Sequence, residues 1–142
     1  MKAIGLQRQH GWAQFVSMQP HYNLIYREEE REMLPLCLSE GIGVTPWSPL
    51  ARGLLAGRSV SDTASTKRAE TDRTARALYE ATMAQIAYAW VASRPAVTAP
   101  IVGISKLGQF EDAIAALDVT LSEEDVATME APYRPKPVAG HS

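Results

Sequence analysis

Cysteine and histidine are both scarce in this 142-residue sequence, which holds one of the first and three of the second. The single cysteine, Cys37, cannot form an internal disulfide, and its leucine neighbours indicate a buried thiol in a reducing compartment. The histidines, His10, His21 and His141, have no cysteine or carboxylate at metal-ligand spacing. We therefore expect no metal site.

An excess of charge of one sign and long apolar runs are also missing. The formal net charge is -2 and the isoelectric point is about 5.9, which gives no electrostatic attraction for nucleic acid or anionic lipid. No stretch approaches the ~18 consecutive apolar residues of a membrane-spanning helix, and no secretory signal opens the chain. We expect a cytoplasmic protein with no nucleic-acid partner and no membrane partner.

Several catalytic motifs are absent too. The sequence contains no G-x-S-x-G nucleophile motif, and Cys37 does not lie in a catalytic context. The pair Gly41 and Gly43 lacks the third glycine of a dinucleotide fingerprint and precedes a predicted strand instead of following one. Tyr22 beside His21 resembles an acid/base pair, but an aromatic residue at a strand end is the commoner explanation.

What the sequence does contain is an alternation of short apolar runs and helical patterns. After a helix that ends at Gly11, the apolar runs predict strands at 15–19, 42–47 and 99–103. Helical patterns follow at 27–40, with a kink at Pro35, at about 72–93, and at about 107–117. Ser122 and Asp125 predict a capping box before a last short helix, and a proline-rich extended tail follows it.

This alternation predicts an α/β fold with a parallel sheet. Three strand–helix units are present, whereas an eight-stranded barrel needs ~250 residues. We therefore expect residues 1–142 to form a single partial domain. It would contain about the last three βα units of a TIM (β/α)8 barrel, with a C-terminal helix and tail.

In such an array a ligand lies beyond the carboxyl ends of the strands, at 19–23, 47–58 and 103–109. In the third segment, Ser105 and Lys106 at a helix N-terminus suit a phosphate, although they could also be only a cap and a solvated cation. In the second, Trp47 offers a flat ring for stacking on a nucleotide, but a core tryptophan is an equally good interpretation.

At these segments the sequence resembles the aldo-keto reductases. The residues that carry the resemblance are MQPHYNL at 18–24, GVTPWSPLARGLL at 43–55, APIVG at 99–103 and APYRPKPV at 131–138. The similarity covers nearly the whole chain, and the sequence is close to bacterial members that are themselves similar to the potassium-channel β subunits. It implies a (β/α)8 barrel that reduces aldehydes and ketones with NADPH.

The resemblance also implies a set of cofactor-binding residues. Gln19 would contact the nicotinamide amide, and Trp47 would stack on the nicotinamide ring. Lys106, which the family pattern does not supply, would compensate for a missing cation near the 2′-phosphate. The pyrophosphate would lie along Ser48, Pro49, Leu50, Ala51 and Arg52. Two residues of the following loop, Arg58 and Arg68, would clasp the cofactor. Its adenosine end would contact Gly103, Ser105, Gln109 and Asp112.

Two departures from the family pattern shape our expectation of function. No segment matches the family's catalytic Asp, Tyr, Lys and His, so we expect a truncated cofactor-binding portion of an NADP-dependent oxidoreductase, inactive alone. Ile104 and Gln109 stand where a Lys and an Arg often meet the 2′-phosphate, so NADPH binding should be weak and NAD is not excluded. The alternative is a non-catalytic nucleotide-binding or interaction module. We expect association with a complementary N-terminal half or with itself.

Overall fold

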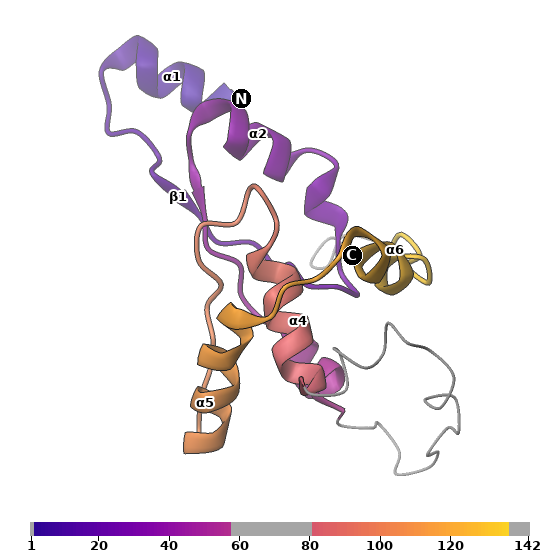
Figure 1. Cartoon of the computed structure of the whole chain (residues 1–142). Coiled ribbons are helices and arrows are strands. Elements are labelled where there is room, and N and C mark those ends of the chain that lie inside the picture. Colours follow the sequence, from indigo (N-terminus) through magenta and orange to yellow (C-terminus); the bar gives the residue numbers. More distant parts are fainter. Residues whose placement is uncertain (1, 58–80, 137–142) are drawn as a thin grey trace.

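The computed structural model describes residues 2–57 and 81–136 (Figure 1). Its helices and strands are α1 (Lys2–His10), β1 (Ser17–Met18), the 3-10 helix η1 (Glu28–Glu30), α2 (Met33–Glu40), β2 (Gly43–Val44), the 3-10 helix η2 (Ala51–Ala56), α4 (Met83–Ala92), α5 (Leu107–Ala115), the 3-10 helix η3 (Ala116–Asp118) and α6 (Glu123–Glu130). The chain is open in outline: α1 and α2 lie at one end and α5 extends from the other.

The sheet is parallel, as predicted, but much smaller. Strands β1 and β2 pair with Ser17 opposite Gly43 and Met18 opposite Val44. The prediction of a third strand at 99–103 is wrong. The chain runs beside β2 through one bridge, between Val44 and Val97, and through an N–H of Ile101 that donates to Pro46 at 2.8 Å. Because Pro100 has no N–H to donate, a regular ladder cannot continue through this segment.

The predicted helix at 27–40 is two helices in the structure. Residues Arg31 and Glu32 separate η1 from α2, so Pro35 lies in the first turn of α2 and causes no kink. A missing N–H is harmless there, because the first N–H groups of a helix have no partner inside the helix. The predicted end at Gly41 is confirmed, since this residue has a left-handed φ of 68°.

Polar caps begin the later helices. The predicted capping box is confirmed: the Asp125 N–H donates to Ser122 Oγ at 3.1 Å, and the Ser122 N–H donates to Asp125 Oδ2 at 2.9 Å. A second capping box, which we did not predict, joins Thr82 and Gln85 at the start of α4. Within the described residues, the helix that we predicted from about 72 begins at Met83. Residues 72–80 of this prediction lie outside the described residues.

The core lies between α2, β2 and α4. Its fully buried members include Tyr22, Cys37, Val44, Trp90 and Val91. The predicted burial of Cys37 is confirmed, and this burial raises the pKa of the thiol. Since Trp90 and Val91 come from α4, the later half of the chain closes the core that the first two strands begin.

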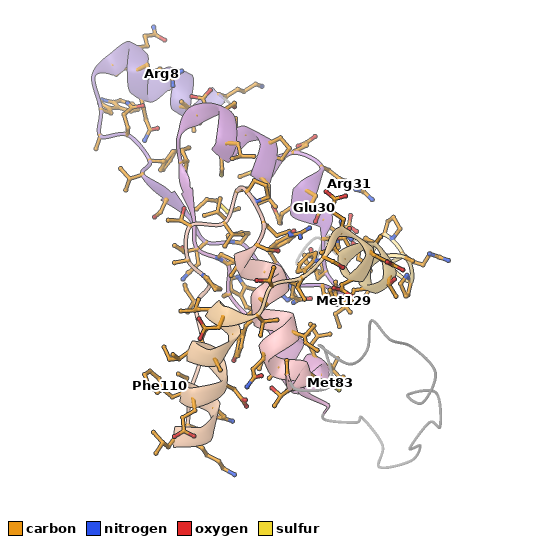
Figure 2. The ribbon with its side chains drawn as sticks, in the orientation of Figure 1. Arg8, Glu30, Arg31, Met83, Phe110 and Met129 are labelled. Carbon is orange, nitrogen blue, oxygen red and sulfur yellow. The ribbon has the colours of Figure 1, made fainter. Side chains whose placement is uncertain are left out.

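A group of charged side chains surrounds the buried Trp90 and joins three parts of the chain. The Trp90 indole N–H donates to Glu130 Oε1 at 2.9 Å, and Arg94 bonds the same oxygen at 3.0 Å. Arg27 pairs with the other Glu130 oxygen at 2.8 Å and with Glu30 at 2.9 Å. Helix α6 is thereby tied to α4 and to Arg27, the residue before η1; Glu30, the last residue of η1, is labelled in Figure 2.

The C-terminal tail is extended, as predicted, and it is held by Glu28. The Tyr133 hydroxyl and the Lys136 N–H each donate to Glu28 Oε1 at 2.6 Å. Arg31 pairs with the other oxygen at 3.0 Å. These hydrogen bonds and the nearby cation lower the pKa of the Glu28 carboxyl, which keeps the charged form that the tail requires.

Helix α5 turns an apolar stripe away from the rest of the molecule. Leu107 and Leu117 are each 73% exposed, and Phe110 and Ile114 are about half exposed. Phe110 lies on the outer side of α5 in Figure 2. Among the described residues, no helix is long and apolar enough to cross a lipid bilayer.

The charged group around Trp90 generates a stability prediction. Glu130→Ala should lower the free energy of unfolding by about 2 to 4 kcal/mol, because it leaves the buried Trp90 N–H and two arginines without their shared acceptor. Urea denaturation followed by circular dichroism measures the change. The control is Glu124→Ala on the exposed part of the same helix, with an expected change of about 0.5 kcal/mol or less. Equal losses in the two variants would contradict this account of the network.

Candidate functional site

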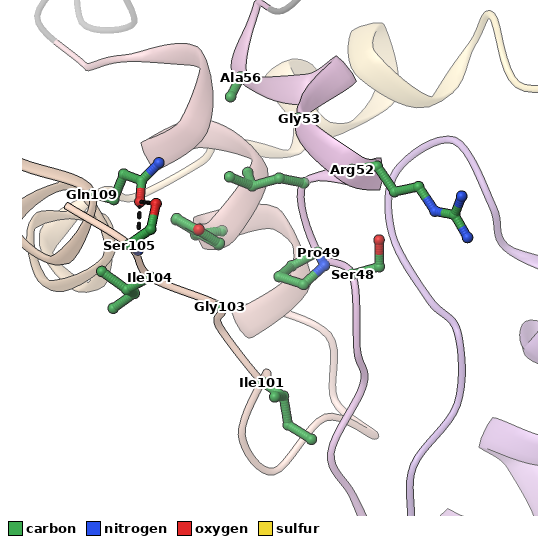
Figure 3. Close-up of a pocket in the computed structure, with 12 residues that line it drawn as sticks. Ser48, Pro49, Arg52, Gly53, Ala56, Ile101, Gly103, Ile104, Ser105 and Gln109 are labelled. Atoms are coloured by element: carbon green, nitrogen blue, oxygen red, sulfur yellow. Dashed lines mark hydrogen bonds between the residues drawn. The ribbon is translucent and has the colours of Figure 1, made fainter.

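Half of the fourteen predicted site residues line one pocket. The pocket has a volume of about 490 Å³ and lies between η2 with its preceding turn and the segment that leads into α5 (Figure 3). Seven predicted residues line it: Ser48, Pro49, Leu50, Arg52, Gly103, Ser105 and Gln109. The first four follow strand β2 in the chain, and the last three come from the start of α5 and the segment before it. Two strand–helix units therefore build the site together.

The turn that forms one wall has an unusual backbone. Ser48, Ala51 and Arg52 have φ values of 58°, 48° and 58°, in the left-handed region that non-glycine residues avoid. Such conformations cost about 1 to 3 kcal/mol each and persist where surrounding contacts hold them. Here the Ser48 carbonyl accepts from the Ala51 N–H at 2.9 Å and from Asn23 Nδ2 at 3.0 Å. The buried Ala51 is part of the wall's support and does not line the pocket.

The opposite wall contains the start of α5, and the N–H groups of Ser105 and Lys106 just before this helix already have an acceptor. Gln109 Oε1 accepts from the Ser105 N–H at 2.8 Å, from Ser105 Oγ at 3.1 Å and from the Lys106 N–H at 3.1 Å. Sequence reasoning assigned these donors to a phosphate. A phosphate at this position would have to displace the Gln109 carboxamide. The Lys106 side chain is exposed and does not line the pocket.

Trp47 lies at the edge of this region with one face already covered. Its ring stacks on His21 with a centroid distance of 4.3 Å and an interplanar angle of 16°, and His21 stacks in turn on Tyr26 at 4.4 Å. Trp47 remains 40% exposed, which leaves ring surface for a ligand. The neighbouring Tyr22 is a core residue, 1% exposed, whose hydroxyl donates to Glu30 at 2.7 Å.

Comparison with known families decides the identity of this arrangement. The model of the Aldo/keto reductase family matches residues 1–134. The chain belongs to this family.

Relatives in the family are similar over most of this chain. A protein of Schizosaccharomyces pombe that carries the provisional name aryl-alcohol dehydrogenase is 45% identical over 92% of this chain and 42% of its own length. An aldo-keto reductase of Fusarium vanettenii is 44% identical over 93% of this chain and 40% of its own length. The versiconal hemiacetal acetate reductase of Aspergillus parasiticus is 39% identical, over 90% of this chain and 43% of its own length.

The chain thus spans less than half the length of these aldo/keto reductases. The family fold is a (β/α)8 barrel, and the two parallel strands with their helices are consistent with part of one. The relatives named above come from fungi, and the expected similarity to bacterial members and potassium-channel β subunits stays a prediction.

Five of the predicted aldo/keto reductase site residues do not line the pocket, among them Ala51 and Lys106 described above, and two others lie outside the described residues. Gln19 lines a separate cavity of about 470 Å³ between α1, β1 and α2. Asp112 lines a cavity of about 350 Å³ that adjoins the pocket through Leu50, Gly103 and Gln109. Trp47 lies beside the pocket without lining it. Arg58 and Arg68 lie outside the described residues.

Asp112 has partners within the protein. Its Oδ1 accepts from Gln85 Nε2 at 2.7 Å and from Thr82 Oγ1 at 3.2 Å, which ties α5 to the start of α4. Burial raises the pKa of the Tyr88 hydroxyl, and the nearby Asp112 carboxylate adds to this effect. A contact of Asp112 with an adenosine group remains a prediction.

Sequence reasoning missed four residues that line the pocket: Gly53, Ala56, Tyr88 and Ile101. Ile104, which it expected beside the 2′-phosphate, lines the pocket too. Tyr88 was hidden because its helix was interpreted through the spacing of its core residues. Ile101 was assigned to the interior of a strand. Within the described residues there is no group of three or more His, Cys, Asp or Glu side chains that could hold a metal ion.

Proposed function

We propose that this chain supplies the dinucleotide-binding face of an aldo/keto reductase, an oxidoreductase that converts a carbonyl to an alcohol with NADPH. Family membership and relatives named as reductases support the reaction class. The observation that carries the proposal is the pocket of about 490 Å³, because seven residues predicted from the sequence to contact the cofactor line it. The pocket is within the ~300 to 1,000 Å³ of small-molecule sites.

The pocket has features that fit an extended dinucleotide. Gly103 is open to the pocket: a Cβ built there would meet no protein atom within 4 Å, so a ligand backbone could approach closely. The left-handed turn at Ser48 and Arg52 presents backbone groups and a guanidinium on the other side. Figure 3 shows Ser105 and Gln109 on one side of the pocket and Pro49 and Arg52 on the other.

The residues present would bind and orient the cofactor. A reduced nicotinamide supplies a hydride when it is bound. Trp47 would present its free ring surface to a planar group, and Arg52 would pair with a phosphate through charge-assisted hydrogen bonds. The Ser105 and Lys106 N–H groups would serve a second phosphate after Gln109 is displaced.

We expect the affinity of the chain alone to be weak, and two features support this. Gln109 Oε1 competes for the α5 N–H groups, and Ile104 in the pocket wall offers no charge to a 2′-phosphate. Each missing charge-assisted hydrogen bond is worth about 1.5 to 3 kcal/mol. NADPH is the proposed cofactor, with NADH as the competitor to be tested.

A second role, as an interaction module, is supported by exposed apolar side chains. Leu107 on α5, Leu117 on η3 and Val16 beside β1 are 73%, 73% and 79% exposed. Apolar surface of this extent marks association sites in many proteins. We propose that these residues contact a complementary segment that carries the catalytic groups, or a second copy of the chain.

The cofactor assignment predicts different effects for two substitutions. Lys106→Ala should weaken NADPH binding about 3- to 10-fold more than NADH binding, because only NADPH carries the extra phosphate. Trp47→Ala should weaken both alike, by about 5- to 10-fold, through lost stacking. Isothermal titration of the two dinucleotides measures the affinities. Lys2→Ala, which removes a cation from α1, is the charge-matched control and should leave their ratio unchanged.

An unchanged affinity ratio in Lys106→Ala would show that Lys106 is only a solvated cation. Failure of the unmodified chain to bind either dinucleotide would contradict the proposed function itself.

The reaction assignment predicts that the chain alone has no reductase turnover. A positioned general acid contributes about 10² to 10⁴ in rate, and we propose that this acid comes from a complementary segment. Consumption of NADPH with a panel of aromatic and aliphatic aldehydes is the measurement. Reductase turnover by the purified chain would contradict this prediction, because it would require a general acid among the tyrosines of the chain itself.

A further inference from the structure

Asn23 is a fully buried polar residue at the back of the Trp47–Ser48 turn, and every atom of its carboxamide has a partner. Its relative exposure is 0%. Its Oδ1 accepts from the Ile25 N–H at 3.1 Å, while its Nδ2 lies 3.0 Å from the Ser48 carbonyl oxygen and 3.2 Å from His21 Nε2.

These contacts fix the orientation of the Asn23 amide. The Ile25 N–H can only donate, so the atom facing it must be the carbonyl oxygen. The Ser48 carbonyl can only accept, so the atom facing it must be the amide nitrogen. Because this nitrogen has only hydrogens to offer, His21 Nε2 must accept, which requires a neutral imidazole with its hydrogen on Nδ1.

His21 is also part of the stack that supports Trp47. Its ring lies between Tyr26 and Trp47, at centroid distances of 4.4 and 4.3 Å. The backbones of His21 and Trp47 form a parallel bridge, and the Trp47 N–H donates to Pro20 at 2.9 Å. His21 therefore contacts the Trp47 ring directly. Through Asn23 it is also linked to Ser48, whose φ is left-handed.

We propose that Asn23 and neutral His21 are positioning residues that hold the Trp47–Ser48 turn in its ligand-accepting form, and that protonation of His21 releases this turn. Protonation would place an N–H on Nε2 against the Asn23 amide hydrogens, so two donors would face each other. The strained Ser48 would then lose a contact that supports its positive φ. This inference rests on the proposed dinucleotide site only for its functional consequence.

The charges around His21 favour the neutral form. Burial lowers the pKa of His21 below its usual value of 6.5, and the cations Arg52 from η2 and Lys136 from the tail lower it further. Among the described residues, the rings of Tyr26 and Trp47 stack on the two faces of His21, and the Asn23 amide faces its Nε2. Because the folded pKa is depressed, the neutral form prevails above pH 6.5 and is lost as pH falls through the lower, folded pKa.

The test is a pH titration of tryptophan fluorescence on the full chain without cofactor. Trp12 stacks on His10 at 4.8 Å and would add its own signal, so a Trp12→Phe background is used. We expect a quenching step with a midpoint below pH 6.5 that arises from Trp47 and disappears in His21→Phe, which keeps a flat ring in the stack. His10→Phe in the same background is the matched control and should leave the step in place.

Substitution of Asn23 tests the coupling. Asn23→Ala should raise the midpoint by about half to one pH unit, because it removes a hydrogen bond that only the neutral imidazole accepts. Asn23→Asp should raise it further, since a carboxylate favours the imidazolium. A midpoint that both variants leave unchanged would overturn the proposal, provided that circular dichroism shows both to be folded.

If the Asn23 variants do not fold, nitrogen NMR of the imidazole in the unmodified chain decides the matter. An unprotonated Nε2 and a protonated Nδ1 at neutral pH are expected, and the opposite tautomer would overturn the proposal. NADPH affinity measured on both sides of the midpoint gives the functional consequence, with weaker binding expected below it. Failure to bind NADPH at any pH contradicts the proposed function, whereas equal affinity on both sides contradicts only the control of the turn by His21.

Discussion

The carboxylate of Glu130 is the interaction on which the rest of the structure depends. It accepts the indole N–H of the buried Trp90 and pairs with Arg27 and Arg94, at distances of 2.8 to 3.0 Å. A charge that leaves bulk water needs such a complete set of partners to offset its desolvation. Because the partners come from the loop before η1 and from α4, the last helix holds the early and late strand–helix units in one arrangement.

The pocket depends on this arrangement. Its walls come from two strand–helix units that share few sheet hydrogen bonds, since only β1 and β2 form a regular ladder among the described residues. Helix α4 lies between the walls, contributes Tyr88 to the pocket and holds α5 through Asp112. The left-handed turn at Ser48 is supported separately by Asn23, so the two walls are positioned by different buried polar groups.

Features that depend on nearby residues could be predicted from the sequence. The cap at Ser122 and the helix end at Gly41 follow from local backbone chemistry, and the structure confirms both. The strand expected at 99–103 failed because its pairing depends on a neighbour and on the missing N–H of Pro100. The bonds of Gln109 back to its own helix start, and the His21 stack on Trp47, depend on side-chain orientation, which no pattern of apolar residues records. The resemblance therefore located the segments that form the site. It did not indicate that the Ser105 and Lys106 N–H groups already donate to Gln109.

The central claim is that the pocket between the Ser48 turn and the start of α5 takes a nicotinamide dinucleotide. Amide NMR of the full chain titrated with NADPH tests it most directly. The account predicts saturable shifts of the amide signals of Ser48, Gly103 and Ser105, with little change at Ile42 beside the separate cavity between α1 and α2. Shifts confined to that other cavity, or no saturable shift at the pocket, would contradict the account.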